Sequence, residues 1–427
     1  MAAASYGALF RNRPYVRIFS AGLGSTLGSA ISSVCLIWVV FAATGSALDV
    51  AFLGTAFLLA SMLCSTLSGT IVDRYDRRRL MILADSVRAV AMASVVVALW
   101  VVGFDLYLLL AAYAVVGAFT TLFNPAEQAI VPAVVAATDL ENANGLIQSS
   151  RSSLQFVGAS VAGGLIVTVG PTVGIAVNAV TFAISAALIT GMRIAESARI
   201  PRRGGRRASY REDLRAGFAW LYRATGLFQL TISATFFNFC STVIATFLVV
   251  YATEVLHGSA LVFAFLLAAQ VAGLAIGSVL VGRVGAVRFV GKAWVLPYGV
   301  ASGAVALLLS LVPSATLATA VMFVLGLFAG FAGTAWLSAA QLLVPSEMQG
   351  RYFGIDQLGS IAILPAAQIG GALLIAGFGT RTTYLAAAVV WLVAGAAFLV
   401  PRALWTLAVH PAPPATPRNG GGEAGRP

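Results

Sequence analysis

Long apolar runs separated by short polar turns dominate the pattern of hydrophobic and polar positions along the chain. The run from Val50 to Val72 holds 23 residues without a charge. An α-helix of about 20 apolar residues spans a lipid bilayer. The pattern predicts an all-α integral membrane protein with twelve transmembrane helices, at residues 18–43, 48–72, 80–102, 104–125, 143–169, 172–192, 228–252, 258–282, 290–312, 315–339, 352–377 and 381–401.

Composition excludes a soluble protein. Hydrophobic residues make up 59% of the 427 residues and the mean hydropathy is +0.93, whereas soluble domains are roughly 45–50% apolar. The first apolar run follows Arg11, Arg13 and Arg17 and is longer than the core of a signal peptide. It is therefore predicted to be a retained membrane helix.

The positive charges predict the orientation. All but three of the 26 lysines and arginines lie in the N-terminus, in the tail, or in the turns after the second, sixth, eighth and tenth predicted spans. Because cytoplasmic loops carry the excess of lysine and arginine, both termini are expected in the cytoplasm, with the protein in a bacterial plasma membrane. The net charge of +11 follows this pattern, and no nucleic-acid recognition motif accompanies it, so no nucleic-acid partner is expected.

The chain contains an internal repeat at an offset of 213 residues. Residues 45–53 read GSALDVAFL and residues 258–266 read GSALVFAFL. The same offset takes Gly117 to Gly330 and Gln128 to Gln341. The repeat predicts two pseudo-symmetric six-helix halves in parallel topology. The expected divisions are a cytoplasmic N-terminus at 1–17, an N-terminal six-helix half at 18–192, a basic cytoplasmic linker at 193–227, a C-terminal six-helix half at 228–403, and a disordered tail at 404–427.

The linker is strongly basic, with nine arginines between residues 193 and 223. Ser209 and Glu212 have the spacing of a capping box, and apolar residues then recur at helical spacing. This pattern predicts an amphipathic helix that lies on the cytoplasmic membrane face and is attracted to anionic lipid headgroups.

The turn between the second and third spans is the most charged short segment of the chain. Residues 68–80 read SGTIVDRYDRRRL, with six charged side chains in the seven positions 73–79. The pattern G-x-x-x-D-R-x-x-R-R from Gly69 to Arg78, set between two of twelve spans, resembles the major facilitator superfamily. The strings FNPAEQAIVP, LENANGL and LMILADSVRA, at 123–132, 140–146 and 80–89, resemble its exporter branch that includes enterobactin and macrolide efflux proteins.

The resemblance covers about residues 10–403 and implies a function. It implies a secondary active transporter that works by alternating access and exports a hydrophobic or amphipathic small molecule, such as a drug, a siderophore or a natural product. The chain departs from the antiporter patterns of the superfamily: Ala159 stands where a proline often follows glycine in the fifth span, and Ser29 stands where an acid often follows the glycine of the first span. The coupling ion, a proton or another ion, stays open.

The resemblance also implies a conformational latch that holds the two halves together in one state and releases them in the other. Its expected members are Gly69, Asp73, Arg74, Arg77, Arg78, Glu127 and Asp356. The alternative is that the charged turn only sets the topology.

Charged residues inside spans are costly, at about 2.5–3.5 kcal/mol each at a helix centre. Asp85 and Arg88, at i and i+3, are expected to form a structural intramembrane ion pair. Arg151 is expected to be either a structural bridge or a contact to the substrate.

The resemblance places the substrate cavity among the first, fourth, seventh and tenth spans. Its candidate residues, each of which can equally serve helix packing, are Ser25, Ser29, Trp38, Tyr113, Phe119, Arg151, Phe236, Asn238, Thr242 and Trp336. Glycine pairs at i and i+4 predict close helix packing; they are Gly24/Gly28, Gly273/Gly277 and Gly326/Gly330.

Enzyme chemistry finds no support in the sequence. The two histidines, His257 and His410, lack the spacing of a metal site or a catalytic triad, and there is no P-loop. The expectation is a monomeric transporter without cofactor, metal or disulfide. The alternatives are an importer, a flippase-like carrier of lysophospholipid, and a non-transporting membrane receptor or scaffold.

Overall fold

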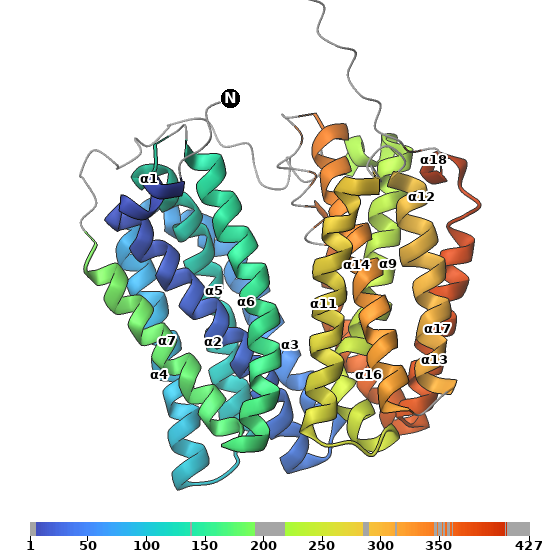
Figure 1. The fold of residues 1–427 in the computed structure, drawn as a ribbon, viewed down its shortest axis with the longest axis horizontal. Helices are drawn as coiled ribbons and strands as arrows, with labels where there is room; N and C mark the ends of the chain where they lie inside the picture. The colour runs from blue at the N-terminus through green and yellow to red at the C-terminus, as the bar shows by residue number, and fades with distance from the viewer. Residues whose placement is uncertain are drawn as a thin grey trace, which may run out of the picture.

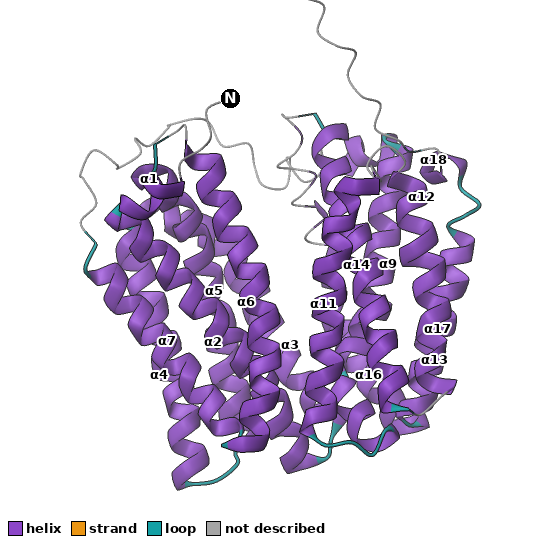
Figure 2. Ribbon diagram, viewed as in Figure 1, coloured by secondary structure: helices purple, strands orange, loops and turns teal. Residues whose placement is uncertain are grey.

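The computed structural model describes residues 6–136, 139–192, 218–284, 290–311, 314–345, 348, 352, 355–356, 359–360, 362–405 and 407. Figure 2 shows this part of the chain as helices joined by short loops. The linker prediction for 193–217 and the tail prediction for 408–427 lie outside the described residues. The protein is therefore all-helical over the described ranges.

Ten helical segments among the described residues are long and apolar enough to cross a bilayer. They are α2 (Arg13–Thr44), α3 (Ala47–Arg74), α4 (Arg77–Val101), α5 (Leu106–Val134), α7 (Pro171–Thr190), α9 (Thr225–Thr246), α11 (Ala260–Val284), the segment formed by α12 (Val290–Trp294), η5 (Val295–Ala301) and α13 (Ser302–Leu311), α14 (Ala315–Leu343) and α17 (Thr380–Ala397). Short helices are α1 (Tyr6–Arg11), α10 (Leu248–Val250), the π-helix η3 (Tyr251–Val255) and α18 (Arg402–Trp405).

Two more helices lie where the fifth and eleventh spans were predicted. They are α6 (Leu140–Thr168) and α16 (Leu364–Phe378). Neither counts among the ten: α6 carries charged and polar side chains along its first half, including Arg151, and α16 has 15 described residues. The described residues thus contain ten candidate spans, against the twelve predicted for the whole chain.

Local capping residues explain where several helices begin and end. Gly45, at φ 63°, ends α2 in the left-handed conformation that glycine adopts without strain. The hydroxyl of Ser46 then accepts a hydrogen bond of 3.2 Å from the Asp49 N–H and starts α3. Asp76 caps α4 in the same way, accepting from the Arg79 N–H at 3.1 Å.

Two predicted continuous spans contain breaks. Helix α9 ends at Thr246 and is followed by α10 and the π-helix η3. The segment at 290–311 passes through η5, which contains Pro297. Proline lacks an N–H and cannot donate the regular helical hydrogen bond, so a local π-turn is the physical consequence.

Figure 1 shows α2 and α4–α7 gathered on one side of the view and α9, α11–α14 and α17 on the other. Helix α3 packs against both α5 and α16, and α6 packs against α11, so these contacts join the two groups. Thr55 of α3 donates a hydrogen bond of 3.0 Å to Gln368 of α16. The ring of Trp38 stacks on Phe263, with 6.4 Å between centroids. Both contacts lie toward the end of α2 that is away from its N-terminus.

Glycines allow the backbones of α11 and α14 to touch. Cβ atoms added at Gly273, Gly277, Gly326 and Gly330 would each meet backbone atoms of the opposite helix. The packing prediction for these two pairs is confirmed. It is wrong for Gly24, which has nothing within 4 Å of an added Cβ. Gly28 does allow a close approach to α7, because a Cβ there would meet the side chains of Asn178 and Thr181 and the Asn178 Cα.

Candidate functional site

A cavity of about 490 Å³ lies among helices α2, α5, α6 and α7. Single residues of α3, α4 and α11 complete its wall: Phe57, Arg88 and Leu267. The lining combines hydroxyl and amide side chains, two guanidinium groups and an apolar, aromatic side. Such a mixed, concave site is typical of small-molecule binding.

Four of the predicted cavity residues line it: Ser25, Ser29, Tyr113 and Arg151. The other six are not part of its lining, and the structure places them elsewhere. Trp38 stacks on Phe263, and Phe119 packs on an apolar cluster between α2, α4 and α5. Phe236 contacts the ring of Phe237, and the side-chain oxygen of Asn238 lies 3.5 Å from the Tyr298 hydroxyl. Thr242 is half-buried on α9, and Trp336 packs against the large hydrophobic core.

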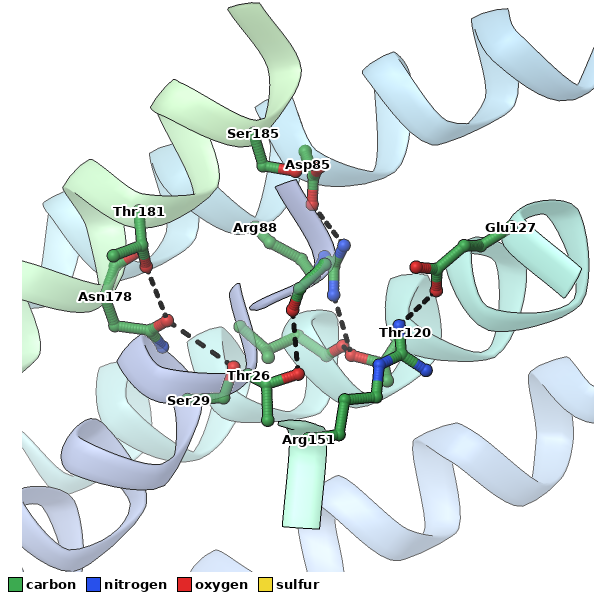
Figure 3. Close-up of polar contacts among 12 residues, drawn as sticks. Thr26, Ser29, Asp85, Arg88, Thr120, Glu127, Arg151, Asn178, Thr181 and Ser185 are labelled. Atoms are coloured by element: carbon green, nitrogen blue, oxygen red, sulfur yellow. Dashed lines mark hydrogen bonds and ion pairs between the residues drawn. The ribbon is translucent and has the colours of Figure 1, made fainter. Parts of the chain in front are cut away.

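Arg151 forms an ion pair with Glu127 across α6 and α5. Figure 3 shows the two side chains pointing toward one another. Gly22 of α2 makes this pair possible, because a Cβ there would lie 2.6 Å from a Glu127 oxygen and 3.1 Å from a guanidinium nitrogen of Arg151. Glu127 was expected as a latch partner, and in this structure its partner is Arg151.

Arg88 forms the second ion pair, with Asp85 on the same helix. The Ser185 hydroxyl donates to Asp85 at 2.5 Å. The Arg88 guanidinium lies 4.5 Å from the ring centre of Phe123 and 4.4 Å from that of Phe182. Two aromatic faces and a carboxylate together compensate for the buried positive charge.

An amide network forms the wall between α2 and α7. The Asn178 side-chain amide donates to the Ser32 hydroxyl at 2.7 Å. The Ser29 hydroxyl lies 3.5 Å from the side-chain oxygen (Oδ1) of Asn178, and the Thr181 hydroxyl lies 3.4 Å from the same atom (Figure 3). These hydrogen bonds fix the amide and join the two helices.

Two arginines of the charged turn bind backbone carbonyls within the N-terminal group of helices. Arg77 donates to the Ala129 carbonyl at 3.0 Å, and Arg78 donates to that of Ile189, also at 3.0 Å. The side chains of Asp73 and Arg74, and the surroundings of Gly69, are outside what the structure describes. Asp356 is buried, and its Oδ1 has no hydrogen-bond partner among the described residues. The latch therefore stays a prediction.

Sequence reasoning missed three residues that shape the cavity: Gly22, Thr120 and Asn178. Asn178 had a signal, because an amide within an otherwise apolar span is costly unless it is hydrogen-bonded. Thr120 contacts Arg88 at 3.4 Å, and Gly22 makes space for an ion pair. Neither role leaves a pattern in the sequence, because each depends on which helices become neighbours.

Comparison with known proteins identifies the family. One family of the major facilitator superfamily is described as transmembrane secretion effector, and its model matches residues 4–404 of this chain. The chain belongs to this family. Transmembrane secretion effectors are transporters of the superfamily and not enzymes.

Two relatives of this secretion effector are efflux proteins. The multidrug efflux pump Tap of Mycobacterium tuberculosis is 28% identical over 234 residues, which cover 52% of this chain and 55% of Tap. Macrolide efflux protein A of Streptococcus pyogenes is 24% identical over 275 residues, covering 64% of this chain and 66% of that protein. The match thus spans about half the length of Tap.

Solved structures share the fold. A transporter of the POT family, crystallised with a thioalcohol-conjugated peptide, has a TM-score of 0.68 at 12% identity and covers 91% of this chain and 96% of its own. A bacterial homologue of the lysosomal transporter Spinster has a TM-score of 0.66 at 16% identity, covering 90% and 96%. The secretion effector is therefore a multi-span membrane transporter with the superfamily fold.

Proposed function

We propose that this secretion effector is a secondary active transporter of the bacterial plasma membrane that exports a hydrophobic or amphipathic small molecule by alternating access. The observation that carries the proposal is the cavity between α2, α5, α6 and α7, whose lining is part polar and part aromatic. The names of Tap and macrolide efflux protein A support export as the direction.

The proposed architecture has twelve spans in two pseudo-symmetric halves, at 18–192 and 228–403. Equivalent helix pairs support it. Tyr113 packs on Phe57 between α5 and α3, with 4.9 Å between ring centroids. At the offset of 213 residues, Gly326 packs on the backbone of Gln270 between α14 and α11. The same two positions therefore meet in both repeats.

Alternating access needs a barrier on one side of the cavity at a time. The Thr55–Gln368 hydrogen bond and the Trp38–Phe263 stack join the two groups of helices at the end away from the N-terminus. With both termini in the cytoplasm, as the arginine distribution favours, these contacts form an outer barrier. The structure then corresponds to an inward-open state, and a reporter fused after Arg402 would locate the tail.

The coupling ion is proposed to be a proton or another ion. Glu127 and Asp85 are the acids beside the cavity, and each is paired with an arginine. Collapse of the proton gradient by a protonophore would stop proton-coupled export and leave sodium-coupled export running.

The test of function measures export directly. Cells lacking their own major efflux pumps, with and without this protein, are compared for accumulation and minimum inhibitory concentration over a panel of amphipathic compounds. Compounds whose accumulation falls or whose inhibitory concentration rises on expression are then tested for uptake into inside-out vesicles. Ala159→Phe places a ring in the cavity and is expected to abolish transport. The matched control is Val157→Phe on the same helix, where the side chain is 41% exposed and is not part of the cavity lining.

Three results would contradict the proposal. Vesicles that move no compound would favour a receptor or scaffold. Accumulation that rises on expression would favour an importer or a lysophospholipid carrier. Equal transport by Ala159→Phe and Val157→Phe would show that this cavity does not hold the cargo.

A further inference from the structure

Three buried or half-buried donors in the cavity wall lack hydrogen-bond partners among the described residues. They are the hydroxyl of Ser25, the Nε of Arg88 and the Nε of Arg151. Ser25 is 6% exposed and Arg88 is 3% exposed, and all three residues line the cavity. Figure 3 shows both guanidinium groups extending toward the same region beside Thr120. Buried donors in proteins are nearly always satisfied by protein, water or a ligand, so three unpaired donors on residues of one cavity wall leave hydrogen-bonding capacity for an acceptor that enters the cavity.

We propose that Ser25, Arg88 and Arg151 form a donor subsite that binds an uncharged, acceptor-rich group of the cargo, such as a lactone, ester, amide or ketone carbonyl. The inference rests on the proposed function, because it takes the cavity as the binding site. It goes further by assigning the chemical class of the group that is recognised.

Charge balance selects an uncharged acceptor over an anion. Arg88 is already paired with Asp85, and Arg151 is already paired with Glu127. Two cations and two carboxylates leave the subsite with donor capacity but no net charge. An anionic cargo would add a third negative charge to a buried site, and an uncompensated buried charge is strongly unfavourable.

The remaining walls set the shape of the rest of the cargo. The Ser32 hydroxyl and Asn178 amide on the α2–α7 side are hydrogen-bonded to each other, so they have less capacity left for a ligand. Another part of the lining presents the rings of Phe57 and Tyr113, which contact each other at a tilt, together with Leu267. The expected cargo is therefore an amphipathic molecule with a carbonyl at one end and an apolar or aromatic body that lies on these rings.

Three small probes of similar size test the proposal by equilibrium dialysis against the purified protein in lipid nanodiscs, with empty nanodiscs subtracted. 7-Methoxycoumarin is uncharged and carries a lactone carbonyl. 2-Methoxynaphthalene has the same ring size without the lactone. 7-Methoxycoumarin-3-carboxylate adds a negative charge. We expect 7-methoxycoumarin to bind most tightly, 2-methoxynaphthalene more weakly, and 7-methoxycoumarin-3-carboxylate most weakly.

Ser25→Ala removes the hydroxyl without adding volume. It should weaken binding of 7-methoxycoumarin roughly 2- to 12-fold, the range for one hydrogen bond, and leave 2-methoxynaphthalene unaffected. Ser33→Ala is the matched variant, since Ser33 lines the same cavity from the same helix but already donates to the Ala30 carbonyl at 3.0 Å. Its effect should be the smaller one. Thermal melting of each variant checks that the fold is retained.

The outcomes separate the subsite from the proposed function. If Ser25→Ala and Ser33→Ala bind the coumarin equally, while Ala159→Phe blocks it, the donor subsite is overturned and the cavity stands. Tighter binding of the carboxylate than of the neutral coumarin also overturns the subsite. If Ala159→Phe changes the binding of no probe, the cavity itself is not the binding site, and both proposals fall.

Discussion

At the scale of single residues, the cavity depends on a glycine that forms no side-chain contact of its own. Gly22 leaves the space in which Glu127 of α5 meets Arg151 of α6. Glu127 is 2% exposed, so its charge depends on Arg151 for compensation. A side chain at position 22 would therefore disturb an ion pair on two other helices.

Gly22→Ala is expected to destabilise the protein by about 1 kcal/mol, the low end of the usual cost of overpacking, because the atoms it meets are the ends of two side chains that can shift, and to reduce transport by disturbing their ion pair. The physical reason is the added Cβ, which would lie 2.6 Å from a Glu127 oxygen. Thermal melting in detergent and vesicle transport measure both effects. Gly24→Ala on the same helix is the control, because nothing lies within 4 Å of its added Cβ. Equal melting temperatures for the two variants would contradict this role of Gly22.

At the scale of helices, the two repeat-related pairs pack differently. Helices α11 and α14 meet backbone to backbone through four glycines. Helices α3 and α5 meet in the same way at Gly117, but the rings of Phe57 and Tyr113 pack between them at a tilt and line the cavity. The aromatic pair thus forms a cavity wall where its repeat counterpart forms a tight seam.

Gly330→Ala is expected to lower the stability of the protein by about 1–3 kcal/mol. An added Cβ would lie 2.8 Å from the Leu274 carbonyl carbon, and a backbone atom cannot move aside as a flexible side chain can. The matched variant is Gly333→Ala on the same helix, which has nothing within 4 Å of its added Cβ. If Gly330→Ala melts at or above the temperature of Gly333→Ala, the contact between α11 and α14 is not closely packed at Gly330.

At the scale of the whole molecule, two features are expected to set the balance between inward-open and outward-open states. The Thr55–Gln368 hydrogen bond joins α3 to α16, and it is expected to hold the end away from the N-terminus closed. Asp73, by resemblance to the superfamily, is expected to hold the opposite end closed by meeting the start of the eleventh span. Substitutions at Thr55 and at Asp73 should therefore shift the equilibrium between the inward-open and outward-open states in opposite directions.

Asp73→Asn should favour the inward-open state by roughly 5- to 150-fold, the range of a 1–3 kcal/mol coupling, and slow transport. Thr55→Val should favour the outward-open state by roughly 2- to 12-fold, because it removes one buried hydrogen bond. Gln155→Cys, in the cavity lining, reports the balance through labelling with an impermeant maleimide from either side. The background lacks Cys35, Cys64 and Cys240.

The control for Asp73→Asn and Thr55→Val is a substitution of another acid in the charged turn. Asp76→Asn changes a neighbouring acid of the same turn, whose described role is to cap α4, and should leave the labelling balance close to that of the parent. A shift in the same direction for Asp73→Asn and Thr55→Val would contradict the two-barrier account. No shift for Asp73→Asn would leave the charged turn as a topology signal only.

The sequence by itself determined that this protein crosses the membrane many times, because burial in lipid demands long apolar helices and their lengths and breaks appear directly in the residue pattern. It also indicated the superfamily through its charged turn, and it predicted the Asp85–Arg88 ion pair from the spacing of these residues on one helix. Only the tertiary structure decided that Arg151 pairs with Glu127, that Arg88 faces the cavity, and that Trp38 packs on Phe263 outside the cavity lining. The physical reason is that periodicity fixes which residues share a helix face, whereas partners across helices depend on how the helices pack against one another.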